Sequence, residues 1–230
     1  MKAVLSESIR LLRNRWFYLS AIFTVLVLWM DLCPHMDMLQ GSKKDEIVYL
    51  LADILSGKGN LLSLPLLSVL PCAAGVCQEV NTGVARYAIF YGGYRRYVLS
   101  KVTALLLSAL LSQFIGVTIF SGTVSWITGF FALAPAPLIM QRLLLASCFA
   151  MLGHISALLT GDAVSAYVMP LVFVFTLSMF RSRFFFGAAY MDPKMWLSAK
   201  GLAIPLVFTA FLLLTALSLL LTAWEVRRHA

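Results

Sequence analysis

Long apolar runs alternate with short polar segments along the chain. Six of these runs are long enough to be membrane spans, at about 16–32, 61–77, 98–120, 139–159, 164–180 and 201–224. A helix needs about 20 apolar residues to cross a hydrocarbon core about 30 Å thick. Lipid offers no partner for backbone groups, so such runs are expected to be helical. The pattern predicts an all-α, polytopic membrane protein with about six transmembrane helices in a membrane domain over residues 16–224.

The N-terminal segment 1–15 precedes the first run and differs from it in pattern. Apolar residues recur there at helical spacing, and basic residues lie between them: Val4, Leu5, Ile9, Leu12 and Trp16, with Lys2, Arg10, Arg13 and Arg15. This pattern is typical of an amphipathic helix at the membrane interface. The alternative is a basic flank that only orients the first span. Both interpretations place the N-terminus in the cytoplasm, and with six spans the basic tail 225–230 is cytoplasmic as well.

The second apolar run carries two prolines, Pro65 and Pro71. Each removes a backbone donor and is expected to kink a helix. Membrane helices tolerate such breaks where neighbouring groups satisfy the freed carbonyls. The prolines have two interpretations. They belong to a helix that lines a transport pathway, or they form a fixed kink without a role.

The most polar internal segment, residues 78–101, follows this run. Its basic residues Arg86, Arg95, Arg96 and Lys101 indicate the cytoplasmic side. Residues 84–91 are too apolar for a solvated loop, and the pair Gly92-Gly93 is a turn signal. We expect a short amphipathic helix followed by a sharp turn.

The number of spans depends on residues 98–138, which are almost wholly apolar. They fit one span followed by an external segment, or two short spans joined near Ser121-Gly122. With six spans, ten of the eighteen Lys and Arg residues lie in the cytoplasm. A seventh span would add five and remove the two at the C-terminus, giving thirteen. Charge bias favours seven spans, whereas length favours six, the number that we expect.

Composition supports a membrane protein and argues against other classes. The chain is 61% hydrophobic and 12% charged, whereas soluble domains run at about 45–50% and about 25%. Its net charge is +8, but the basic residues lie beside the apolar runs. That position fits the cytoplasmic preference of Lys and Arg and makes nucleic acid an unsuitable partner.

Motifs for catalysis or cofactor binding are absent from the sequence. It has no phosphate-binding loop, no metal-ligand spacing and no nucleophile motif. We therefore expect a non-catalytic subunit that binds no cofactor itself. The four cysteines and His154 are expected to be packing residues. The predicted span centres hold no carboxylate, which weakens a secondary transporter driven by protons or sodium.

Residues 79–101 resemble the cytoplasmic segment between the second and third spans of type-2 ATP-binding-cassette (ABC) exporter permeases. Those proteins carry a Glu, then Gly-Thr or Thr-Gly with an Arg, then Gly and Arg before a Lys that opens the next span. The corresponding residues here are Glu79, Thr82-Gly83, Arg86, Gly93, Arg95, Arg96 and Lys101. Many relatives have Gly-Thr where this chain has Thr-Gly. The general layout of the chain is also similar to that of small bacterial permease subunits.

The resemblance implies a permease in the inner (cytoplasmic) membrane that pairs with a second permease subunit and with two copies of a separate ATPase holding ATP and Mg. Residues 79–97 would be the coupling segment, with Glu79, Arg86, Arg95 and Arg96 docking the ATPase or bracing the segment. The arginines have an alternative role at anionic lipid head groups. Residues 181–200 would re-enter the membrane from outside.

The substrate would be a peptide, drug or lipid-like molecule moved out of the cytoplasm. A secondary transporter or channel, and a membrane assembly factor that transports nothing, are the alternative functions.

Overall fold

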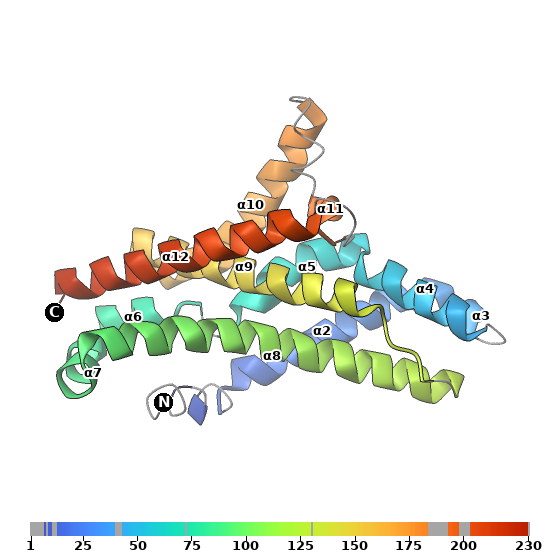
Figure 1. Ribbon diagram of the computed structural model, residues 1–230, viewed down its shortest axis with the longest axis horizontal. Coiled ribbons are helices and arrows are strands. Elements are labelled where there is room, and N and C mark those ends of the chain that lie inside the picture. Colours follow the sequence, from blue (N-terminus) through green and yellow to red (C-terminus); the bar gives the residue numbers. More distant parts are fainter. Residues whose placement is uncertain are drawn as a thin grey trace.

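The computed structural model describes residues 7, 9–10, 13–39, 43–71, 73–129, 131–183, 193–197 and 203–229. Apart from short connections these residues are helical, and none of them forms a strand, so the predicted all-α class is confirmed for the described chain. The helices, labelled in Figure 1, are α2 (Arg15–Leu32), η1 (Cys33–His35), α3 (Met36–Leu39), α4 (Lys44–Leu55), α5 (Lys58–Val69), α6 (Gly75–Asn81), α7 (Val84–Gly92), α8 (Tyr94–Thr128), α9 (Ala136–Thr160), α10 (Ala163–Arg183), α11 (Pro193–Leu197) and α12 (Ala203–His229).

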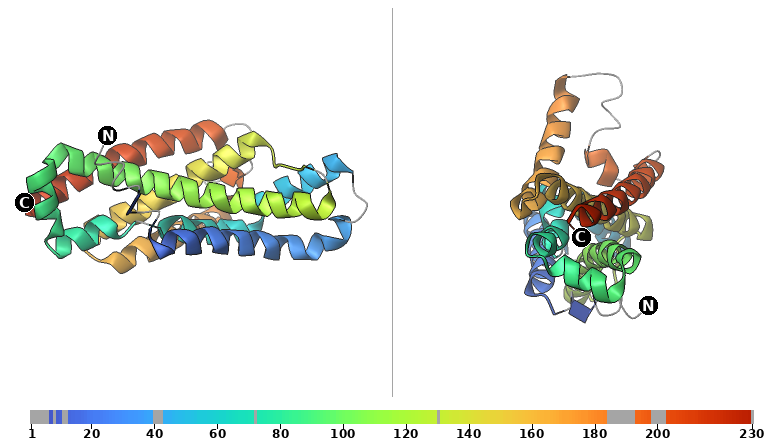
Figure 2. Two further views of the ribbon diagram at one scale, coloured as in Figure 1. Left: turned by 90° about the horizontal axis from the view of Figure 1, so that it is seen from below. Right: turned by 90° about the vertical axis from the view of Figure 1, so that its left-hand side faces the viewer.

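The long helices lie along one axis and form an elongated bundle, whereas α10 leaves the bundle obliquely (Figures 1 and 2). Helix α9 is central, because it packs against α5, α8, α10 and α12. Small residues allow this close packing. A Cβ at Gly153 would lie 2.6 Å from the carbonyl oxygen of Ala166 on α10, so only glycine fits there. Small residues at helix contacts are the usual solution in membranes, where van der Waals packing holds helices together.

Helices α2 and α8 make a second close contact. A Cβ at Gly116 would come within 2.8 Å of the Thr24 side chain, so the two backbones approach as closely as a glycine permits. The side chain of Gln113 donates a hydrogen bond to Thr24 Oγ1 (3.0 Å) one turn away. The interior of this interface is therefore polar as well as tightly packed.

Among the described residues, four helical segments are long and apolar enough to cross a membrane: Arg15–His35, Tyr94–Thr128, Ala136–Thr160 and Ala203–Arg228. Helices α4 and α5 give a fifth if this pair, bent by 64°, is counted as one span. The apolar part of α10, Ala163–Met179, is shorter. Large apolar side chains such as Met140, Leu213 and Leu220 are exposed on these helices. These features are consistent with a multi-pass membrane protein.

Helix α8 decides between the two interpretations of residues 98–138. It runs for 35 residues without a break, passing through Ser121 and Gly122 in helical conformation. The alternative of two short spans joined at this point is therefore wrong, because one helix covers residues 98–128. The chain leaves it at Gly129, in a left-handed conformation, and enters α9 after Pro135.

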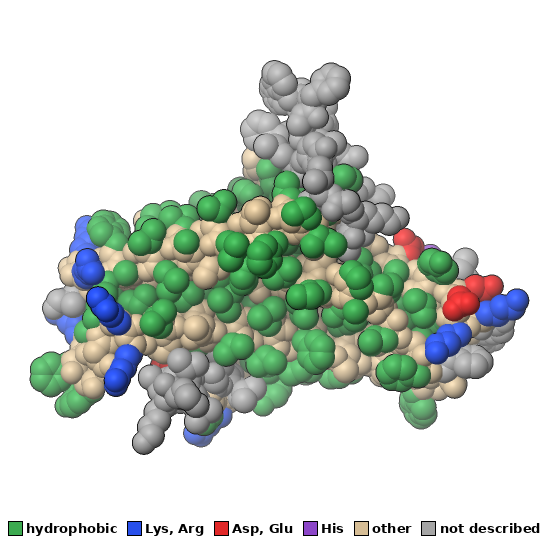
Figure 3. Space-filling view, in the orientation of Figure 1, with side chains coloured by type: hydrophobic (Ala, Val, Ile, Leu, Met, Phe, Trp, Pro, Cys, Tyr) green, Lys and Arg blue, Asp and Glu red, His purple; other side chains and the backbone are tan. Residues whose placement is uncertain are grey.

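Charged side chains gather at the two ends of the bundle and leave its flank apolar (Figure 3). One end, which we call the basic end, carries α7 and the last turn of α12, with Arg86, Arg95, Arg96, Arg227 and Arg228. The opposite end, which we call the acidic end, carries α3 and α4, with Asp37, Lys43, Lys44, Asp45, Glu46 and Asp53. An apolar flank between charged ends is the surface that a bilayer covers.

Several predicted segments fall partly outside the described residues. Most of the amphipathic helix expected at 1–15 lies outside them, as does most of the re-entrant segment 181–200, of which α11 and the end of α10 are described. The tail 225–230 is helical as far as His229, because α12 continues to that residue.

Candidate functional site

Residues 75–101 form three helices separated by two glycines at the basic end. Gly83 has φ 75° and precedes α7, and Gly93 has φ 79° between α7 and α8. Residues with a Cβ rarely adopt these angles, so glycine is what permits both changes of direction. The predicted short helix followed by a sharp turn is confirmed. Helix α7 consequently forms a separate nine-residue helix at the end of the bundle (Figure 1).

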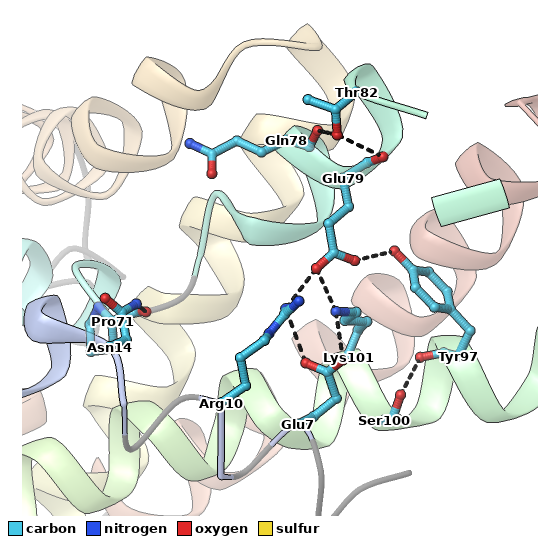
Figure 4. A network of polar contacts seen from close by, with 10 residues as sticks. All are labelled: Glu7, Arg10, Asn14, Pro71, Gln78, Glu79, Thr82, Tyr97, Ser100 and Lys101. Carbon is cyan, nitrogen blue, oxygen red and sulfur yellow. Dashed lines mark hydrogen bonds and ion pairs between the residues drawn. The ribbon is translucent and has the colours of Figure 1, made fainter. Parts of the chain in front are cut away.

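The side chain of Glu79, on α6, lies at the centre of a cluster of charged groups (Figure 4). Its Oε1 atom is 2.6 Å from Lys101 Nζ on α8 and 2.6 Å from Arg10 Nη2 near the N-terminus. The Tyr97 hydroxyl donates a hydrogen bond to Oε2 (2.8 Å). Glu7 completes the cluster at 3.0 Å from both cations. Three parts of the chain therefore meet on one carboxylate.

Burial makes this cluster different from a surface ion pair. The Lys101 side chain is 6% exposed and that of Glu79 is 13% exposed. Surface pairs contribute about 0–1 kcal/mol, whereas removing one partner of a buried pair costs about 3–5 kcal/mol because a charge is left without compensation. The cluster therefore fixes α6 against the first turns of α8.

The charge of Glu79 is favoured by its surroundings. Burial by itself raises the pKa of this carboxyl, but the hydrogen bond and positive charge of Lys101, with the hydrogen bonds from Arg10 and Tyr97, outweigh it. The pKa of Glu79 therefore lies below its ordinary value of 4.5, and the carboxylate is charged near neutral pH.

The four predicted coupling residues do not lie together. Glu79 is half-buried and turned towards the bundle, whereas Arg86, Arg95 and Arg96 are exposed on α7 and the first turn of α8. The cations that contact Glu79 in the described structure are Arg10 and Lys101. The structure thus separates an internal bracing residue from three arginines on the outer surface.

Helix α7 also exposes a set of aromatic side chains that the sequence analysis did not single out. Tyr87 is 72% exposed, and Phe90 and Tyr91 are each 85% exposed. Phe90 and Tyr91 contact each other edge to face, with ring centroids 5.4 Å apart. Together with Arg86 they form the exposed surface of α7, and Arg95 and Arg96 are exposed on the first turn of α8. The sequence did contain a signal for this exposed surface. Residues 84–91 were predicted to form an amphipathic helix, and such a helix directs one of its faces away from the bundle.

A polar hollow of about 420 Å³ lies beside the cluster. It is bordered by Arg10, Asn14, Gln78 and Glu79, among others. Gln78 points away from the carboxylate of Glu79 (Figure 4). Within the described part of the chain, no three His, Cys, Asp or Glu side chains come together as metal ligands.

The two prolines have different effects. Pro65 lies within α5, whereas the helix ends at Val69, just before Pro71, and α6 begins after a turn. The carbonyl of Leu67, which a residue with an N–H at position 71 would bond in a continuous helix, instead accepts from Ser20 Oγ (2.6 Å). Asn14 donates to the Pro71 carbonyl (3.0 Å). The helix thus ends before Pro71, and the carbonyl that Pro71 leaves free is satisfied by α2. A role of either proline in a pathway stays a prediction.

Two further polar side chains, those of His154 and Arg142, lie inside the bundle. His154 is buried, with Nδ1 3.2 Å from the Ala73 carbonyl and Nε2 3.0 Å from Thr222 Oγ1, so it joins α9 to the turn after α5 and to α12. This contact agrees with the predicted packing role. Arg142, on α9, is 1% exposed. It lies within the apolar run predicted as a span at 139–159, where no charged residue was singled out.

No protein-family model matches the chain, and no curated protein sequence shows significant similarity to it. The resemblance to type-2 ABC permeases therefore rests on residues 79–101 and on the general layout of the chain.

Proposed function

We propose that the chain is the membrane-spanning permease subunit of an ABC exporter and that a separate ATPase subunit binds the outer surface of α7. The observation that carries the proposal is the geometry of α7. It is a short helix between two positive-φ glycines, at the end of the bundle, and it exposes Tyr87, Phe90 and Tyr91 as well as Arg86. Exposed Tyr and Phe beside Arg are typical of binding hot spots.

The cluster around Glu79 connects the outer surface of α7 mechanically to the membrane helices. Helix α7 is joined to α6 through Thr82 and Gly83 and to α8 through Gly93 alone. Because Glu79 holds α6 to Lys101, a displacement of α7 acts on α6 and α8 as a unit and not on a loose loop. Closure of an ATPase dimer would then be transmitted as a rigid-body tilt of these helices.

The proposed topology has six spans formed by α2, α5, α8, α9, α10 and α12, with the basic end in the cytoplasm. The clustering of Arg at that end, against mixed charge at the other, supports this orientation. It leaves the N-terminus and the tail 225–230 in the cytoplasm and the segment 181–200 outside. Two permease subunits, identical or homologous, would enclose the pathway in the cytoplasmic membrane, and an exported peptide, drug or lipid-like molecule would pass between them.

The test is loss of the ATPase on removal of the aromatic pair. The tagged chain is purified in detergent from its native membranes, and vanadate-sensitive ATP hydrolysis in the eluate is measured. Phe90→Ala with Tyr91→Ala should lower this activity at least about tenfold, because each hot-spot residue contributes about 2 kcal/mol or more.

The matched control is Trp126→Ala. Trp126 is also 85% exposed but lies near the far end of α8, so its removal should leave the activity unchanged. Absence of ATPase activity from the wild-type eluate, or equal activity in both variants, would contradict the proposal.

A further inference from the structure

The carboxylate of Asp31, near the C-terminal end of α2, lies directly against the start of α5. A Cβ at Gly59 would be 2.4 Å from Asp31 Oδ1, and one at Gly57 would be 3.3 Å from Oδ2. The side-chain amide of Asn60 donates to Oδ2 (3.2 Å). A Cβ at position 59 would therefore collide with the carboxylate, and one at position 57 would crowd it, so the two glycines leave room for an anion at this place.

The start of α5 is itself a favourable place for an anion. Helix α5 has twelve residues, and its N-cap Gly57 provides no side-chain acceptor for the free N–H groups of the first turn. Such N–H groups, with the positive end of the helix dipole, favour negative charge. Asp31 supplies that charge from another helix.

A buried guanidinium stands behind this first turn. Arg142 Nη1 donates to Asn60 Oδ1 (2.8 Å), and Nη2 donates more weakly to Gln113 Oε1 (3.4 Å). The Nε atom of Arg142 is buried without a hydrogen-bond partner. The ion pairs found among the described residues do not include Arg142. Its side chain is thus a buried cation, held by two neutral amides and directed at the residue that binds Asp31.

This arrangement differs from a structural ion pair. A pair that serves stability alone places the carboxylate on the guanidinium, because the cost of burying both charges is recovered only through direct contact. Here Asn60 stands between Asp31 and Arg142, although the two charges still attract each other electrostatically. Asp31 is also only half-buried, at the acidic end, so solutes on that side can reach it.

We propose that the corner where α2, α5 and α9 meet is a carboxylate-binding site, formed by the first turn of α5, the Asn60 amide and the Arg142 guanidinium. In this structure the chain's own Asp31 carboxylate fills it. A carboxylate-bearing solute arriving at the acidic end binds here when the Asp31 side chain withdraws. The site is separate from the ATPase surface proposed at the basic end, and neither proposal depends on the other.

Chemical rescue tests the site with formate as the probe. Asp31→Ala removes the internal carboxylate and leaves space for a small one. The full chain, with any subunits that purify with it, is heated in detergent with and without sodium formate. Formate should raise the thermal midpoint of this variant by about 3–6 °C at a tenfold excess over its dissociation constant. Sodium chloride at equal ionic strength and neutral formamide should not.

Three further variants make the result specific. Asp31→Asn keeps the space filled, and Asp31→Ala with Arg142→Gln removes the buried cation, so neither should respond to formate. Asp37→Ala removes an exposed acid of α3 at the same end and should not respond either. If Asp31→Ala aggregates, its folded yield by size exclusion is compared with and without formate, and recovery by formate supports the site. Failure of formate to stabilise or recover Asp31→Ala, or an equal response of Asp37→Ala, would overturn the proposal.

Discussion

Replacing Glu79 by glutamine isolates the charge at the centre of the basic-end cluster. Glutamine keeps the shape of the side chain and an oxygen that can accept from Tyr97, but it leaves Lys101 and Arg10 with Glu7 as their carboxylate partner in the cluster. Any change in stability therefore reports the charge of Glu79 and not its volume.

The expected loss follows from the burial of each partner. Lys101 is 6% exposed, so removal of its nearer carboxylate should cost about 3 kcal/mol, the low end for a broken buried pair, because Glu7 remains 3.0 Å away. The Arg10 side chain is 56% exposed, and its share should be below about 1 kcal/mol. We expect the free energy of unfolding to fall by about 3–4 kcal/mol.

A double-mutant cycle measures the pairwise part. Unfolding of the purified protein by denaturant in mixed micelles is compared for Glu79→Gln, Lys101→Met and the double variant. The double variant should be more stable than the two single losses predict, with a coupling of about 2 kcal/mol. Asp162→Asn removes an exposed acid at the basic end and should change stability by less than about 0.5 kcal/mol. Additive effects, agreeing within about 0.5 kcal/mol, would refute a buried interaction between Glu79 and Lys101.

Two further predictions concern pH and backbone conformation. The pKa of Glu79 is lowered in the folded chain, so its stabilising contribution is present above its ordinary value of 4.5 and is lost as the pH falls below it. The difference in thermal midpoint between wild type and Glu79→Gln should therefore shrink as the pH falls below 4.5, and parallel curves would contradict this. Gly93 has φ 79° and ψ 143°, a conformation restricted almost entirely to glycine, so Gly93→Ala should lower the free energy of unfolding by about 1–3 kcal/mol. Gly75→Ala, in a helix with open space around the site, should be neutral or slightly stabilising in the same denaturant assay, and equal losses in both variants would argue against strain at Gly93.

Local patterns in the sequence were sufficient to predict much of the fold. The apolar runs 16–32, 139–159 and 201–224 became α2, α9 and α12 near their predicted bounds, because hydrophobicity and helix formation depend on neighbouring residues. The run 61–77 was instead divided between α5 and α6. The short helix α7 and the turn at Gly93 were predictable for the same reason. The residues 98–138 were ambiguous, since a uniformly apolar run carries no mark of where a helix ends.

The sequence by itself determined a helical chain with an apolar flank and a basic segment at residues 78–101. Only the tertiary structure decided what its charges contact. Glu79 meets Lys101 and Arg10, which are 22 and 69 residues away in the chain. Arg142 lies near the start of an apolar run, and Asn60, 82 residues away, becomes its partner only when α5 packs beside α9. Secondary structure arises from neighbours along the chain, whereas the environment of a charge depends on which distant helices surround it.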